Sequence, residues 1–124
     1  MTQITGVRTV AVPVTDQARA LAFYRDTLGF EVRMDAPIGP GVRWIEVAPP
    51  GAPTSVALAP ASDTAPAGVD TGIRLSTADA AADHAALAAQ GADADAEVMI
   101  TDFAPPMFTF RDPDGNQLVI VQDA

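Results

Sequence analysis

The chain contains an internal repeat, and this repeat constrains its fold more than any other feature of the sequence. Residues 10–30 and 73–92 both run from an alternating strand pattern through a polar cap and an alanine-containing helix pattern to a glycine. Farther along, residues 44–58 and 107–121 superpose without gaps. Because self-similarity at this spacing indicates a repeated structural unit, the sequence predicts two copies of one β-α-β-β-β module.

The boundary between the two modules is predicted in residues 59–68. This stretch, APASDTAPAG, has the proline, alanine, serine and glycine content of a linker. We therefore expect a first module over residues 1–60 and a second over residues 69–124. A chain of 124 residues with 48% hydrophobic residues is long enough to bury a core, so both modules are expected in one α+β domain.

Local signals agree with this order of elements. Residues 9–14 alternate with a period of two, as in a strand with one face against a core. Asp16 is positioned to cap a helix that ends at Gly29. Residues 76–90 combine a serine-x-x-acid capping pattern with an alanine-rich helix. Residues 112–115, DPDG, predict a turn between the last two strands.

Composition limits the classes of partner. The formal charge is −9, from 16 acidic and 7 basic residues, so the chain repels nucleic acid and anionic lipid, while a cationic or neutral small ligand is favoured. Solubility alone would also explain this charge. The sequence has no cysteine, which favours the reducing cytoplasm. No apolar run approaches the ~20 residues of a membrane span, and the N-terminus lacks the pattern of a secretory signal. We expect a cytoplasmic protein without nucleic acid or membrane partners.

Two stretches resemble a known family. VRTVAVPVTDQARALAFYRDTLGFEV, residues 7–32, and FTFRDPDGNQLVIV, residues 108–121, are similar to the vicinal oxygen chelate superfamily, which includes glyoxalase I, bleomycin-resistance proteins, extradiol dioxygenases and fosfomycin-modifying transferases. The resemblance implies two β-α-β-β-β modules, each curling a mixed sheet into half of a cup. It also implies a homodimer, since modules of this family commonly pair in dimers. Function in the family lies in the cup, so the fold alone does not name a reaction.

The resemblance also implies where metal ligands would lie. The metal enzymes of the family have one ligand in the first strand and one in the last strand of each module, usually histidine, glutamate or glutamine. In this sequence those positions are Thr9 and Val56 in the first module, and Asp70, or alternatively Gly72, and Val119 in the second. One possible ligand out of four does not hold a metal with useful affinity. We therefore expect no metal and no cofactor.

The single histidine does not change this expectation. His84 lies in the middle of the predicted second helix, at a position that the family does not use for a ligand. Neighbours such as Ala81 and Leu87 explain that segment by packing, so His84 is predicted to lie on the helix surface.

Strand alternation predicts the lining of the cup. Trp44 would offer a flat stacking surface and an indole donor, and Met107 a deformable wall. Arg74 either pairs with Glu46 or Asp70 or contacts the ligand. The residues predicted to contact the ligand are Thr9, Trp44, Glu46, Val56, Asp70, Arg74, Phe103, Met107, Thr109 and Val119. The same alternation places Ala11, Leu58, Gly72 and Val121 on the cup side.

Two loops are expected to frame the cup. They span residues 35–43 and 99–107, and both are rich in proline or glycine. Phe103 in the second loop is predicted to act either as a lid over the ligand or as a contact between molecules.

These observations support one leading hypothesis and two alternatives. The leading hypothesis is a metal-free binding protein, similar to bleomycin-resistance proteins, for an aromatic or amphipathic small molecule, with drug sequestration as one use. The first alternative is a glyoxalase- or dioxygenase-like lyase or isomerase with a degenerate site around Glu46 and Asp70, including metal-free acid–base catalysis by these carboxylates. The second is a dimerisation or regulatory module with a filled cup. The sequence does not decide between an enzyme and a binding protein.

Overall fold

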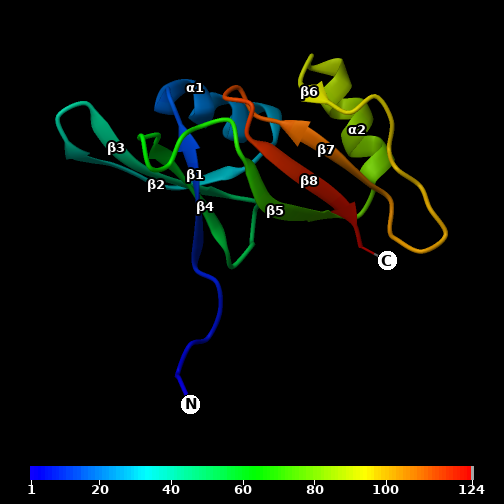
Figure 1. Ribbon diagram of the computed structural model, residues 1–124, viewed down its shortest axis with the longest axis horizontal. Helices are drawn as coiled ribbons and strands as arrows, with labels where there is room; N and C mark the ends of the chain where they lie inside the picture. The colour runs from blue at the N-terminus through cyan, green and yellow to red at the C-terminus, as the bar shows by residue number, and fades with distance from the viewer. Residues whose placement is uncertain (124) are drawn as a thin grey trace. The chain divides into compact units, whose positions relative to one another are not determined.

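The computed structural model describes residues 1–123 and divides into two compact units between Ala65 and Pro66 (Figure 1). This division lies within the stretch predicted as a linker. Each unit contains one mixed four-stranded sheet. Within residues 1–123, no helix is both long and apolar enough to cross a membrane.

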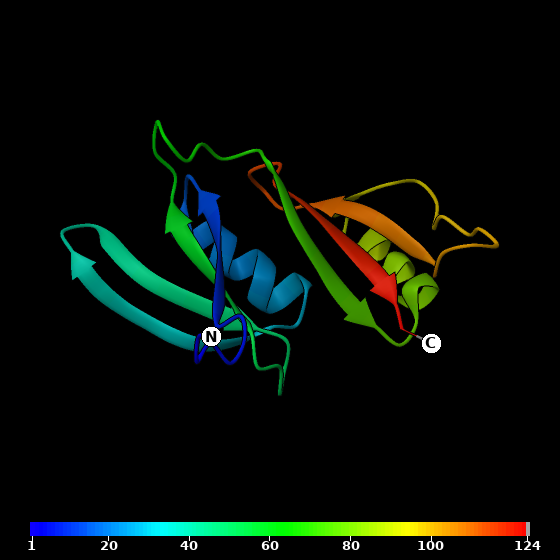
Figure 2. The same cartoon turned by 60° about the horizontal axis from the view of Figure 1, so that its bottom comes forward.

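The first unit is a β-α-β-β-β module. Its strand order is β1-β4-β3-β2, with β1 parallel to β4 and the other neighbours antiparallel. Helix α1 lies against one face of this sheet and contacts β3 and β4 (Figure 2). The elements are β1 (Thr9–Val14), α1 (Gln17–Ala22), the π-helical turn η1 (Phe23–Thr27), β2 (Glu31–Gly39), β3 (Val42–Ala48) and β4 (Ser55–Pro60).

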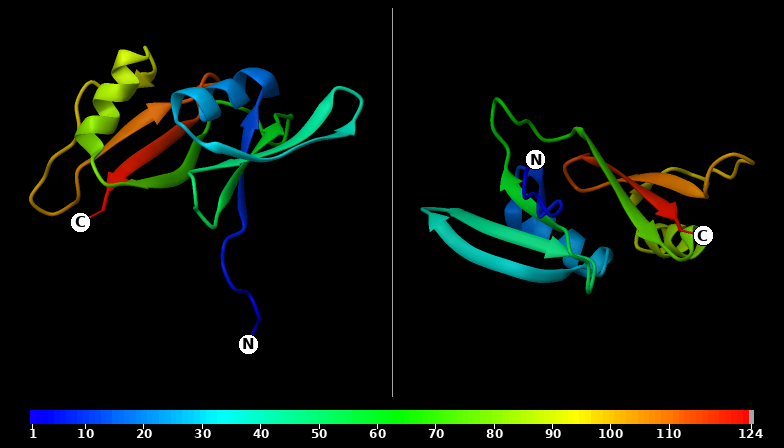
Figure 3. Two further views of the ribbon diagram at one scale, coloured as in Figure 1. Left: turned by 180° about the vertical axis from the view of Figure 1, so that it is seen from behind. Right: turned by 90° about the horizontal axis from the view of Figure 1, so that it is seen from below.

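The second unit repeats this topology. Its strand order is β5-β8-β7-β6, and β5 is parallel to β8. Helix α2 contacts β6, β7 and β8 on one face of the sheet (Figure 3). The elements are β5 (Asp70–Thr77), α2 (Ala80–Ala89), β6 (Asp93–Ala94), β7 (Met107–Arg111) and β8 (Gln117–Gln122). The predicted α+β fold of two β-α-β-β-β modules is therefore confirmed.

The core of the first unit lies between the sheet and its helix. Val12, Ile45 and Val47 are fully buried, as the strand alternation predicts for the helix side. At the end of α1, the Leu28 amide donates to the Phe23 carbonyl at 3.1 Å, which widens the last turn to a π-turn. This turn carries the ring of Tyr24, which is fully buried.

The core of the second unit is built in the same way, from Phe108 and Phe110 on β7 against α2. His84 belongs to this interface. Its ring meets Phe108 edge-on with centroids 5.0 Å apart, and its Nε2 lies 2.7 Å from the Asp95 carbonyl oxygen. The carbonyl can only accept, so Nε2 is the donor. His84 is half-buried rather than free on the helix surface, and it ties α2 to the segment after β6.

The turn between β7 and β8 is closed by buried polar side chains. The Asn116 side chain donates to Asp112 Oδ2 at 3.0 Å, and the Asp112 Oδ1 atom accepts from the Asn116 and Asp114 amides at 3.0 Å each. Asn116 Oδ1 also accepts from the amides of Gly68 and Val69, at 2.8 and 3.1 Å. The DPDGN sequence therefore fastens the start of the second unit to its last hairpin, which is a structural role.

Candidate functional site

The face of the first sheet opposite α1 carries the candidate site. Residues directly paired across strands place their side chains on the same face of a sheet. Thr9 pairs with Ser55, Ala11 pairs with Ala57, and Glu46 also pairs with Ala57. Trp44, two residues before Glu46 on β3, points to the same side. We call this surface the Glu46 face, and its residues are Thr9, Ala11, Trp44, Glu46, Ser55 and Ala57.

A carboxylate is buried at the centre of the Glu46 face. Glu46 is only 9% exposed. Its Oε1 accepts from the Ser55 hydroxyl at 2.6 Å, and its Oε2 accepts from the Trp44 indole nitrogen at 2.7 Å. The Glu46 side chain on β3 therefore contacts Ser55 on β4, and it also lies close to Thr9 on β1.

The direction of the hydrogen bond between Thr9 and Ser55 follows from counting their hydroxyl hydrogens. It lies 2.9 Å from the Ser55 hydroxyl and 3.4 Å from Glu46 Oε1. Ser55 has one hydroxyl hydrogen, which is used for Glu46. Thr9 is therefore the donor to Ser55, and its longer contact with Glu46 is secondary.

These donors keep Glu46 ionised. The hydrogen bond from Ser55 and then that from Trp44 lower the pKa of the carboxyl below its ordinary value, and Thr9 and the charge of Arg8 act in the same direction. Burial acts in the opposite direction but does not prevail. The Glu46 face therefore presents a negative charge at neutral pH.

The predicted orientation of Val56 and Leu58 is wrong. Val56 pairs with Val10 and with the fully buried Val47, so its side chain lies on the helix side with theirs. Leu58 pairs with Val12, which is fully buried on that same side. The residues of β4 on the Glu46 face are instead Ser55 and Ala57, and neither was predicted.

The length of one loop explains this error. The connection from Ala48 to Ser55 has six residues, whereas the connection from Arg111 to Gln117 has five. A superposition without gaps therefore shifts β4 by one residue, and a shift of one residue moves every side chain of a strand to the opposite face. The sequence signal for the true orientation is that the larger apolar Val56 and Leu58 alternate with the smaller Ser55 and Ala57.

The second sheet has a corresponding face with different chemistry. Met107 pairs with Val121, Thr109 pairs with Val119, and Arg74 pairs with Val119. We call these five residues the Val119 face. The apolar side chains and Thr109 are half-buried, and Arg74 is exposed. In the strand register these five residues therefore share one face within their unit, and their contact with a ligand stays a prediction.

Asp70 lies on the same side of β5, at a bulge. It pairs with Gln117, and the register then shifts before Arg74. Gly72 has a φ of 70°, which few other residues adopt easily, and its amide donates to Asp70 Oδ1 at 3.0 Å. Arg74 donates weakly to the Gly72 carbonyl at 3.4 Å. The predicted alternative of an ion pair between Arg74 and Asp70 is not formed among the described residues.

Phe103 projects from the loop between β6 and β7. It is 90% exposed, and Ile100 in the same loop is 77% exposed. Met99 is anchored by backbone bonds to Met107, at 2.8 and 3.2 Å. Phe103 therefore does not pack on the second sheet, and its role as a lid or as a contact between molecules stays a prediction.

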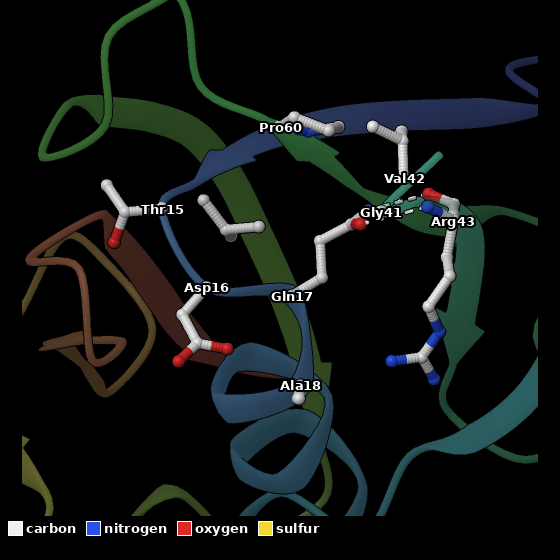
Figure 4. Close-up of a pocket in the computed structure, with 9 residues that line it drawn as sticks. Thr15, Asp16, Gln17, Ala18, Gly41, Val42, Arg43 and Pro60 are labelled. Carbon is white, nitrogen blue, oxygen red and sulfur yellow. Dashed lines mark hydrogen bonds between the residues drawn. The ribbon is translucent and has the colours of Figure 1, made fainter. Parts of the chain in front are cut away.

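A pocket that the sequence did not predict lies at the start of α1 (Figure 4). It has a volume of ≈ 420 Å³, and its lining includes Asp16, Gln17, Arg43 and Pro60. The Gln17 side chain reaches across it, donating to the carbonyls of Arg43 and Leu58 at 2.6 and 2.8 Å and accepting from the Arg43 amide at 3.1 Å (Figure 4). The polar groups of this pocket thus fasten α1 to the sheet.

The residues at the family's metal positions do not fit a metal ion. In strand register, Val119 corresponds to Ala57 rather than to Val56, so both last-strand positions are apolar. Thr9 supplies a neutral hydroxyl that is already donated to Ser55. Among residues 1–123, no three histidine, cysteine, aspartate or glutamate side chains are grouped so that they could hold a metal.

Comparison with known sequences identifies the family of the chain. Residues 6–120 match the family described as Glyoxalase/Bleomycin resistance protein/Dioxygenase superfamily. The uncharacterized protein YetH of Bacillus subtilis strain 168 is 44% identical over 57 residues. That alignment covers 46% of this chain and 48% of YetH, so about half the length of the curated relative is matched.

Solved structures match over nearly the whole chain. TnmS3, an antibiotic binding protein from Streptomyces sp. CB03234, is 37% identical with a TM-score of 0.89, and the match covers 100% of both chains. A member of the glyoxalase/bleomycin resistance protein/dioxygenase superfamily from Sphaerobacter thermophilus DSM 20745 is 35% identical with a TM-score of 0.89, covering 98% of this chain and 100% of that one. A glyoxalase/bleomycin resistance protein from Streptomyces sp. CB03234 is 38% identical with a TM-score of 0.81, covering 94% and 100%.

Proposed function

Because the chain belongs to the glyoxalase/bleomycin resistance protein/dioxygenase superfamily, we propose that it binds an aromatic or amphipathic small molecule on the Glu46 face, without a metal. The observation that carries this proposal is the indole of Trp44, held by a buried carboxylate on the sheet face away from the helix. This arrangement combines an apolar contact surface with one fixed polar group, as small-molecule sites commonly do.

The hydrogen bond to Glu46 fixes the Trp44 ring. With its indole nitrogen 2.7 Å from the carboxylate, the ring loses rotational freedom before any ligand arrives. An aromatic ligand that stacks on it therefore does not have to order it, which favours binding. Of the two small residues on this face, Ala11 is exposed and Ala57 is buried.

The chemistry of Glu46 favours binding over metal-dependent catalysis. The enzyme alternative needs Glu46 as a ligand or as a proton acceptor near neutrality. Its two oxygens already accept bonds from Ser55 and Trp44, and these bonds hold its pKa below the ordinary value. A carboxyl with a lowered pKa is a weak base. The same bonds suit a fixed anion that orients a ligand.

The likeness to TnmS3 supports the class of ligand. That protein is described as an antibiotic binding protein, and it is 37% identical over the full length of both chains. We therefore propose an antibiotic-like aromatic compound as the ligand, with sequestration as the biological use. For Asp70, Arg74, Phe103 and the Val119 face, a direct role in binding stays a prediction.

Calorimetric titration with planar aromatic antibiotics tests the proposal. We expect one ligand per chain, with an affinity on the order of micromolar or tighter, and the same affinity after dialysis against EDTA. Trp44→Ala should abolish binding, whereas Trp44→Phe should retain part of it, since the phenyl ring still stacks. Stoichiometric uptake of nickel, manganese, zinc or iron, with ligand binding only in its presence, would contradict the proposal.

The proposal also covers the oligomeric state, the partners and the cellular location. We propose a homodimer that acts in the cytoplasm, without nucleic acid or membrane partners, which the acidic charge and the lack of cysteine support. The exposed apolar side chains of Ile100 and Phe103 support a contact with a second copy. Sedimentation equilibrium should give twice the chain mass, and Phe103→Ser should weaken the association. A monomer at all concentrations would contradict the dimer.

A further inference from the structure

We propose that the ligand of the Glu46 face carries a protonated nitrogen, which binds Glu46 Oε2 while the adjoining aromatic ring lies on Trp44. This inference rests on the proposed function and adds the chemical class of the ligand, an aromatic amine in its cationic form. It is carried by three observations: a buried carboxylate, the lack of an ion pair to it among residues 1–123, and a carboxylate oxygen that accepts one hydrogen bond.

The first observation is that Glu46 is buried as an anion. It is 9% exposed, its hydrogen-bond donors Ser55 and Trp44 are neutral, and the neighbouring Thr9 is neutral as well. Neutral donors stabilise a carboxylate, but they bring no opposite charge. Burying a charge without a counter-ion is costly in proteins. The protein keeps this anion on the face where the ligand is proposed to bind.

The second observation concerns the cations of the first unit. Three arginines are engaged elsewhere, because Arg25 pairs with Asp26, Arg33 with Glu31 and Arg43 with Asp35. Arg8 acts on Glu46 through its charge. However, no ion pair joins Glu46 to a basic side chain within the described residues.

The third observation concerns the hydrogen bonds that the two Glu46 oxygens accept. Glu46 Oε1 accepts from Ser55, and the Thr9 hydroxyl lies 3.4 Å from the same oxygen. Among residues 1–123, Glu46 Oε2 accepts one hydrogen bond, from the Trp44 indole nitrogen. A carboxylate oxygen accepts two hydrogen bonds. The remaining position of Oε2 lies beside the indole, so one ligand can donate to it and also contact the ring.

The charge of the chain acts in the same direction. A formal charge of −9 attracts cations to the molecule and disfavours anionic ligands. A protonated amine also makes a charge-assisted hydrogen bond with a carboxylate, which is stronger than a neutral one. Local geometry and overall charge therefore select the same class of compound.

A matched pair of probes tests the inference. 2-Naphthylmethylammonium and 2-naphthylmethanol share one ring system and differ mainly in the charge of the donor group. At pH 7 and low salt we expect the cation to bind the wild-type protein about tenfold more tightly than the alcohol, and 2-naphthoate to bind most weakly. The preference for the cation should decrease at high salt. The decrease should be partial, because salt screens a buried charge less than an exposed one.

Three variants test whether the preference comes from the charge of Glu46. Glu46→Gln should reduce it to about twofold or less, because the amide keeps the shape without the charge. Glu31→Gln removes the same charge from an exposed position paired with Arg33, so it should retain the preference and serves as the matched control. Arg8→Ala should increase the preference about twofold, because it removes a competing positive charge.

The outcomes separate the two proposals. If the wild type binds cation and alcohol equally, the inference about the ligand's charge is overturned, while binding of aromatic compounds stands. If neither naphthyl probe nor any aromatic antibiotic binds, both proposals fall. A failure of Glu46→Gln to fold does not remove the test, because the comparison of probes on the wild type decides it.

Discussion

The two sheets have the same topology and the same kind of helix-covered core, but their opposite faces differ. Ile45 and Val47 of the first unit correspond to Phe108 and Phe110 of the second, and all four are buried. On the other face, the corresponding residues in strand register are Trp44 and Met107, Glu46 and Thr109, Ser55 and Gln117, and Ala57 and Val119. The first unit therefore has a fixed anion and an indole where the second has the neutral side chains of Thr109 and Met107.

The two faces of each sheet therefore place different requirements on the sequence. The helix sides must be apolar in both modules because burial there stabilises the fold. The opposite faces carry no such requirement, so they are free to carry chemistry. The Glu46 face uses a polar network of four side chains for that purpose, whereas the Val119 face offers contact area. The following predictions test this contrast, from the largest expected effect to the smallest.

The largest effect is expected for Asn116→Ala, which tests whether the polar residues of the second unit stabilise its turn rather than a ligand. Asn116 is fully buried, and its removal leaves the amides of Gly68 and Val69 without their acceptor. We expect a loss of about 2–4 kcal/mol in the free energy of unfolding. Urea denaturation measures it, and the exposed neighbour variant Gln117→Ala should stay within about 0.5 kcal/mol. Similar losses for both would contradict the structural role.

An intermediate effect is expected for Ser55→Ala on the Glu46 face. The change removes the shortest bond to the buried carboxylate, so we expect a loss of about 1–3 kcal/mol at pH 7. It should also raise the pKa of Glu46 towards its ordinary value, since this bond is the largest cause of the lowered pKa. Thermal unfolding between pH 3 and pH 7 measures both effects.

The pH dependence has a definite sign. A carboxyl whose pKa is lowered by folding stabilises the protein above the pKa of the unfolded chain, and this stabilisation is lost as the pH falls through the lower pKa of the folded state. The stability advantage of wild type over Ser55→Ala should therefore be full near neutrality and shrink in acid, below the ordinary pKa of 4.5. An advantage that grows in acid would contradict the assignment.

The smallest effect is expected for Thr109→Glu, which places a carboxylate at the corresponding position of the second unit. Met107 offers no indole donor there, and the position is half-buried. We expect a loss of about 1 kcal/mol or less, and a pKa for the new carboxyl that is not lowered. NMR titration of the side-chain carboxyl carbon measures the pKa. A value as low as that of Glu46 would show that the strand position, rather than its partners, lowers the pKa.

Much of the fold could be predicted from the sequence, because the repeat and the period of the strands are local signals. The positions of Trp44 and Glu46 followed directly, since both lie on one uninterrupted strand. Val56 was misplaced because the loop before β4 is one residue longer than its counterpart, and strand alternation amplifies a shift of one residue into a change of face. Ser55 was missed for the same reason.

One alternative that the sequence left open, Asp70 or Gly72, and one expectation, that for His84, depend on contacts that no local pattern encodes. The bulge at Gly72 places Asp70, rather than Gly72, opposite Gln117 on the neighbouring strand. His84 packs on Phe108 and holds the Asp95 carbonyl, although its position in the helix pattern indicated the surface. Both depend on residues far apart in the chain, which tertiary structure alone brings together.

The most direct test of the Glu46 face uses the single tryptophan of the chain. In a ¹H–¹⁵N NMR spectrum, the indole N–H of Trp44 gives one side-chain signal, which reports its bond to Glu46. On titration with 2-naphthylmethylammonium, the account predicts that this signal shifts strongly and saturates together with the backbone signals of Glu46 and Ser55. Saturable binding that leaves the indole signal in place, with shifts confined to other parts of the chain, would contradict the account.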